Sequence, residues 1–135
     1  MTRSSPAETA VTTAGAGALR ALRIVSTASV LFIVLQGVTA GEILSRNRMA
    51  ESLHYAGAFV VHALTALTVV AAYLVLRQRR GPWWPTAVAA AIFVVGFVQA
   101  AIGEAGILAV HVPLAMLLLV GAVLVMGWSF ARPQR

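Results

Sequence analysis

Cysteine and lysine are among the residue types missing from this chain, and the absence of cysteine narrows its chemistry. The 135 residues include no cysteine, and all ten of the Lys+Arg residues are arginine. Without cysteine, disulfides, thiolate metal sites and covalent haem attachment through a C-x-x-C-H motif are excluded. Any metal held by this chain would therefore need histidine nitrogens or oxygen atoms as ligands.

Charge is also scarce. Only 10% of the residues are charged and 60% are hydrophobic, and the mean hydropathy is +0.89. A soluble domain of this size cannot bury that much apolar surface. The composition predicts an integral membrane protein whose main partner is the lipid bilayer. The arginines gather at the ends of hydrophobic segments, which is a topology signal and not a nucleic-acid-binding patch.

Four hydrophobic segments are long enough to cross a hydrocarbon layer of ~30 Å. They are residues 24–41, 54–76, 85–103 and 107–130, within a transmembrane domain of residues 21–132. Residues 1–20 are rich in Ser, Thr, Ala and Gly, so we expect a disordered cytoplasmic tail. Residues 42–52 are expected to form an exposed loop. A cleavable signal peptide is the alternative for the first segment, because residues 38–40 have the small-residue pattern of a cleavage site.

The same order of residues occurs twice. Each copy has a glutamine, a glycine and a glutamate at the end of one hydrophobic segment and a histidine at the start of the next. The copies are Gln36, Gly41, Glu42 and His54, and Gln99, Gly103, Glu104 and His111. A repeat of this kind predicts an all-α, four-helix transmembrane bundle built from two similar helical hairpins.

The arginine distribution predicts the orientation. Eight arginines lie before the first segment, in residues 77–80 and after the last segment, whereas two lie in residues 42–52. The excess of arginine marks the cytoplasmic side. We therefore expect a multi-pass protein of the cell membrane with both termini in the cytoplasm. The two histidines of the repeat would then share the outer side.

Small and mildly polar residues recur at helical spacing along three segments, and such stripes face other helices in a bilayer. On the second segment the stripe is His54, Gly57, Ala58, Val61, Thr65, Thr68 and Ala72. On the third and fourth segments the stripes are Gly96, Gln99 and Gly103, and His111, Ala115, Leu118, Ala122 and Ser129.

Ionisable groups within membrane spans are costly without a partner, so the histidines raise a functional hypothesis. Two imidazoles on helices of a bundle can hold a haem iron from both sides, and His54 and His111 are the candidate pair. The alternative is that each histidine bonds a loop carbonyl or water. His62 lies about 12 Å deeper than His54 and is turned by roughly 80°. It could bind a second, deeper group or a threonine or backbone partner.

Three polar residues accompany the histidines. Gln36 and Gln99 lie near the ends of their segments. They either bond across helices or contact the polar groups of a ligand or orient a histidine. Glu51 precedes His54 by three residues. It is either a solvated loop charge or a neighbour of His54 on the same helix face.

Three short motifs give the chain a family resemblance. They are Q-x-x-x-G before a histidine that opens the next segment, E-x-x-H from Glu51 to His54, and H-V-P-L-A from His111. With them, residues 35–119 resemble one four-helix half of the heme A synthase family. The resemblance implies that His54 and His111 ligate haem and that Glu51 is the loop glutamate, our candidate catalytic residue. Family members have two halves in tandem, whereas this sequence contains one. Hydroxylation of a haem methyl therefore does not follow from the resemblance, and a homodimer could supply a second half.

The leading hypothesis is a small membrane protein that binds or handles haem b, with electron transfer to or from a membrane quinone. The alternative is a non-enzymatic membrane subunit or scaffold without a cofactor, within a larger membrane complex. A small multidrug transporter is disfavoured, because that class needs a carboxylate inside a span and no glutamate lies inside one here.

Overall fold

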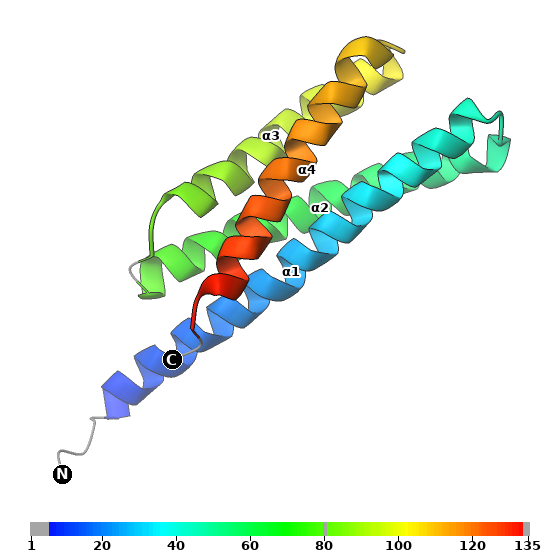
Figure 1. Ribbon diagram of the computed structural model, residues 1–135. Coiled ribbons are helices and arrows are strands. Elements are labelled where there is room, and N and C mark those ends of the chain that lie inside the picture. The colour runs from blue at the N-terminus through cyan, green and yellow to red at the C-terminus, as the bar shows by residue number, and fades with distance from the viewer. Residues whose placement is uncertain (1–5, 80, 134–135) are drawn as a thin grey trace.

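The computed structural model describes residues 6–79 and 81–133 of the chain, and side chains from residue 15 onward. This part folds into α1 (Pro6–Leu44), α2 (Arg48–Arg79), α3 (Trp84–Glu104) and α4 (Leu108–Ala131), as Figure 1 shows. The described residues contain no strand. The predicted all-α four-helix bundle is therefore confirmed.

The helices run alternately up and down, and each packs against its neighbours in a ring. Close backbone approaches in the described chain join α1 to α2, α2 to α3, α3 to α4 and α4 to α1. The helices that carry the repeated histidines, α2 and α4, are therefore diagonal to each other. The short connections at residues 45–47 and 105–107 lie at one end of the bundle, which we call the turn end (Figure 1). The opposite end, which we call the arginine end, holds Arg77 in the last turn of α2. Arg23 of α1 donates to the carbonyl of Arg132 there, and Arg20 lies one turn earlier on α1.

Each helix contains a candidate membrane span, and these spans are Gly15–Leu44, Arg48–Arg79, Trp84–Glu104 and Leu108–Ala131. Their outward faces are apolar: Phe59 is 78% exposed, Leu117 67% and Leu31 63%. Contiguous apolar surface of this kind would be unfavourable in water but is what a lipid bilayer covers. The chain is a multi-pass membrane protein.

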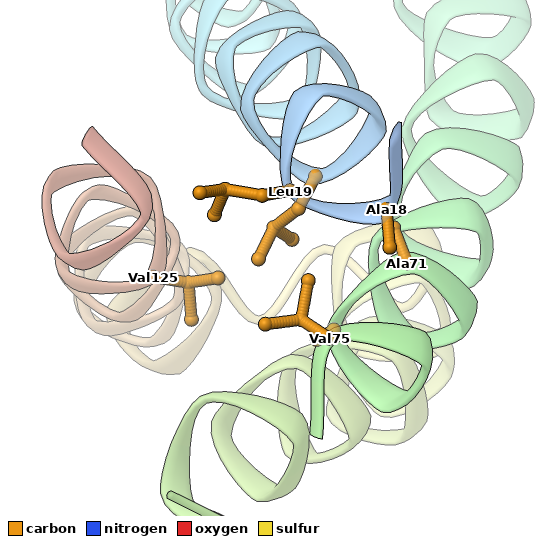
Figure 2. Close-up of a cluster of buried hydrophobic side chains, with 7 residues drawn as sticks. Ala18, Leu19, Ala71, Val75 and Val125 are labelled. Atoms are coloured by element: carbon orange, nitrogen blue, oxygen red, sulfur yellow. The ribbon is translucent and has the colours of Figure 1, made fainter. Parts of the chain in front are cut away.

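The densest packing lies at the arginine end (Figure 2). Leu19 and Leu22 of α1 are fully buried there, and Val125 of α4 is 1% exposed. The alanines that complete this core, Ala18 on α1 and Ala71 and Ala72 on α2, have short side chains, which lets the two backbones approach closely. By contrast, few residues are buried toward the turn end, where the two hairpins separate (Figure 1).

A layer of hydroxyl groups crosses the middle of the bundle. The Ser29 and Thr68 hydroxyls, both buried, lie 3.0 Å apart and join α1 to α2. A cavity of about 10 Å³ beside them is lined by all four helices, including Thr65 and Ala122. A volume of that size admits at most a single water molecule. The predicted inward stripes are confirmed here, because Thr65, Thr68 and Ala72 on α2 and Ala122 and Ser129 on α4 are buried.

The ends of α1 and α2 differ from the predicted boundaries. The structure is helical from Pro6, so the disorder expected for residues 1–20 does not extend through α1. Ala18 and Leu19 are core residues, because this weakly hydrophobic segment packs against the end of α2. The loop expected over residues 42–52 is reduced to residues 45–47, where Arg46 has a φ of 65°. Residues 1–5 lie outside the described chain.

Candidate functional site

The three histidines were the sequence-predicted centre of the site, and the first of them is held between helices of the first hairpin. His54 lies one and a half turns into α2, and its Nδ1 is 2.8 Å from the Thr39 hydroxyl of α1. Thr39 directs its single proton to the carbonyls of Leu35 and Gln36, at 3.2 and 3.0 Å. With the hydroxyl proton directed to these carbonyls, the Thr39 oxygen accepts from His54, and we assign the proton of this imidazole to Nδ1 on that basis.

The second hairpin holds His111 in a related way. His111 Nδ1 donates to the backbone carbonyl of Gln99 at 3.0 Å. In return, the Gln99 side-chain nitrogen donates to the backbone carbonyl of His111 at 2.7 Å. A carbonyl can only accept, so the proton of the neutral ring is again on Nδ1. The reciprocal pair locks α4 to α3 and fixes the plane of the imidazole.

Both rings consequently present the same chemistry. With the proton on Nδ1, Nε2 of His54 and of His111 has a free lone pair, and no described residue donates a hydrogen bond to either atom. A histidine that ligates a metal has this form, because its second nitrogen donates to a carbonyl, carboxylate or water that orients the ring.

Glycines on the neighbouring helices make room for these side chains. A Cβ at Gly103 of α3 would lie 2.5 Å from His111 Cε1 and 2.7 Å from Nδ1. In the first hairpin, a Cβ at Gly57 of α2 would overlap the amide nitrogen of Gln36. The predicted stripe glycines therefore permit the close approach of the site residues, and a larger side chain at either position would displace them.

The two glutamines each retain one unsatisfied polar atom. The Gln36 side-chain nitrogen and the Gln99 side-chain oxygen are buried and lack a hydrogen-bond partner among the described residues. An unpaired buried polar atom costs about 1–3 kcal/mol. These atoms lie beside the histidines of their own hairpins, so the site offers a spare donor and a spare acceptor to a polar ligand group.

His62 lies two turns deeper on α2 and is separate from the pair. Its Nδ1 donates to the carbonyl of Ala58 at 2.8 Å, which leaves Nε2 with a lone pair that is buried and unpartnered in the described chain. The ring packs on Phe97, with centroids 4.4 Å apart, and Nε2 would be 3.4 Å from a Cβ at Gly96. The ring is thus covered by α3.

Glu51, the candidate catalytic residue, is exposed in the first turn of α2. No hydrogen bond between Glu51 and His54 occurs in the described structure. Among the described residues, no three side chains of His, Cys, Asp or Glu are grouped so that they could hold a metal ion.

Thr39 is the site residue that the sequence analysis missed. It lies one turn beyond Gln36, on the same face of α1, and is 8% exposed. Helical spacing from Gln36 could have drawn attention to it. The second hairpin has no hydroxyl in that role, because the Gln99 carbonyl takes its place.

Comparison of the chain with protein-family models, with curated proteins and with solved structures finds no match. The fold therefore defines the class of this protein directly: an all-α, four-helix membrane protein. The resemblance to the heme A synthase family remains a prediction from short motifs.

Proposed function

We propose that this chain is a small membrane protein that binds haem b between α2 and α4, with His54 and His111 as the two iron ligands. The single observation that carries the proposal is that Nδ1 of both histidines lies within hydrogen-bond distance of an oxygen on the neighbouring helix, which leaves Nε2 without a partner among the described residues. α2 and α4 lie diagonally across the ring of helices, so a haem held by both histidines would lie between these two helices.

The residues present fit such a group. Haem brings four of the six iron ligands, so two neutral imidazoles complete the set without a third protein ligand. The unpartnered amide groups of Gln36 and Gln99 are a donor and an acceptor for polar substituents. Gly57 and Gly103 have no side chains, which leaves room on their helix surfaces for Gln36 and His111.

Bound haem b would supply a centre that takes up and releases one electron. The protein orients the iron ligands, because Thr39 and the Gln99 carbonyl hold the two imidazole planes. Hydrogen bonding at Nδ1 also makes the opposite ring nitrogen more basic. A membrane quinone is the partner class we propose for electron exchange, because the site lies within the spans. We further propose that the protein resides in the cell membrane with both termini in the cytoplasm.

The test is an absorption spectrum of detergent-purified protein, oxidised and then reduced, after expression with ample haem supply. We expect a Soret band and sharp bands in the reduced state, as for a low-spin iron with two imidazoles. A colourless protein that is nonetheless folded by circular dichroism would overturn the proposal and favour a structural membrane subunit without a cofactor.

A further inference from the structure

A groove on the outer surface of α1, at the arginine end, is separate from the histidine site. It has a volume of about 490 Å³ and is bounded on the α4 side by Phe130. Arg20 and Arg23 lie at its mouth, and Ile24, Thr27 and Leu31 continue along it toward the middle of the membrane. These positions repeat every three or four residues and therefore form one face of the helix.

The positive charge at the mouth of the groove has no acidic partner among the described side chains. The Arg23 guanidinium is fixed by donation from Nε to the Ser129 carbonyl at 3.1 Å and lies 5.3 Å from the centre of the Phe130 ring. These contacts position the group without neutralising it. Arg20 is exposed and has no hydrogen bond or ion pair with any described residue. The acidic side chains that the structure describes, Glu42, Glu51 and Glu104, belong to the turn end.

A polar atom without a partner lies deeper in the groove. The Thr27 hydroxyl is buried and has no hydrogen bond to any described group. It is four residues beyond Arg23, which corresponds to about 6 Å along the helix axis. Below it, the lining is apolar, with Leu31 63% exposed. Along the groove, the cationic groups therefore come first, the Thr27 hydroxyl second and the apolar side chains last.

A phospholipid presents its own groups in the complementary order: a phosphate, then ester carbonyls, then an acyl chain. We infer that the groove binds one anionic phospholipid from the leaflet at the arginine end, with its phosphate on Arg20 and Arg23 and an ester carbonyl accepting from Thr27. Two guanidinium groups without a carboxylate favour a headgroup of net negative charge over a zwitterionic one, whose ammonium they repel. The inference is independent of haem.

The experiment is native mass spectrometry of the detergent-purified protein with phosphatidylglycerol or phosphatidylcholine of identical acyl chains. We expect the wild type to retain phosphatidylglycerol preferentially, and Arg20→Gln to lower its affinity by about fivefold, the effect of one arginine near a charged lipid surface. Arg20 is exposed and has no hydrogen bond or ion pair with a described residue, so we expect the substitution to leave the fold intact. Thr27→Val, which keeps the side-chain shape, should also weaken binding.

Arg77→Gln is the matched control, because it also removes one positive charge at the arginine end of the bundle. The Arg77 guanidinium lies on α2, 6.0 Å from the centre of the Tyr73 ring, and does not line the groove. It should leave phosphatidylglycerol binding unchanged. Equal losses in Arg20→Gln and Arg77→Gln would show only general charge attraction and would overturn the inference. Equal retention of the two lipids by the wild type, or release of the lipid by inorganic phosphate, would overturn it as well.

Discussion

The imidazole of His111 lies directly against Gly103, so that a Cβ at position 103 would come within 2.5 Å of the ring. No side chain larger than hydrogen fits between α3 and α4 at this height. The ring also donates to the Gln99 carbonyl one turn earlier on α3. Its position is therefore set by contacts to a single neighbouring helix.

Gly103→Ala should displace His111. The overlap should cost about 1–3 kcal/mol, as overpacking does elsewhere, and should lower haem occupancy. Gly41→Ala is the matched control, because Gly41 follows Gln36 as Gly103 follows Gln99 but has open space at its Cβ position. Thermal unfolding and haem content of the two variants should differ. If Gly41→Ala is as damaging as Gly103→Ala, the contact between Gly103 and His111 is not the cause.

Thr39→Val should release the His54 ring from α1. The hydroxyl that accepts from Nδ1 at 2.8 Å would be replaced by a methyl group of similar size. Loss of such an orienting partner typically reduces metal affinity by about 10–100-fold, so we expect weaker haem retention in a titration of the purified protein. Thr39→Ser keeps the hydroxyl and should restore it. If Thr39→Val binds haem as tightly as the wild type, Thr39 does not orient a ligand.

Gly57→Leu should force α1 and α2 apart and reduce the folded yield. A Cβ at this position overlaps the Gln36 amide, and a leucine side chain extends further. Val70→Leu, on the lipid-facing side of the same helix and 55% exposed, should have little effect on size-exclusion profiles in detergent. The smaller change Gly57→Ala should be rescued by Gln36→Ala. If it is not, the amide is not the group that a side chain at position 57 displaces.

Both termini should be on the cytoplasmic side. Eight of the ten arginines lie before the first hydrophobic segment, in residues 77–80 or after the last segment, and arginine is retained on that side. Reporter fusions at the N- and C-termini should both give cytoplasmic signals. A periplasmic signal from the C-terminal fusion would show that the orientation is wrong.

The fold was predictable because the length of an apolar run shows whether a helix can cross the membrane, and the helical spacing of small residues shows which face of that helix packs against other helices. Long apolar runs identified the four spans, and the stripes of small residues identified inward faces such as Thr65 and Ala122. The start of α1 was not predictable in this way. Ala18 and Leu19 follow a stretch of sequence with few large apolar residues, and they are buried in a cluster that includes Val75 of α2.

The site was predictable in part. The repeat predicted His54 and His111 as the candidate pair, and both lie toward the turn end of the bundle. The repeat did not reveal that two different groups, the Thr39 hydroxyl and the Gln99 carbonyl, accept the hydrogen bond from the histidine Nδ1 in the two hairpins. Such partners are set by how the helices are rotated against each other. A threonine in an apolar segment gives no sign of that rotation.

Ligation of haem iron by His54 and His111 can be tested by comparing the optical and electron paramagnetic resonance spectra of three single variants with those of the wild type. We expect His54→Ala and His111→Ala each to lose the low-spin signal, and added imidazole to restore it by occupying the vacated position. His62→Ala should keep the signal, because its ring is covered by α3. A wild-type signal that disappears only in His62→Ala, or a protein that binds no haem, would contradict the account.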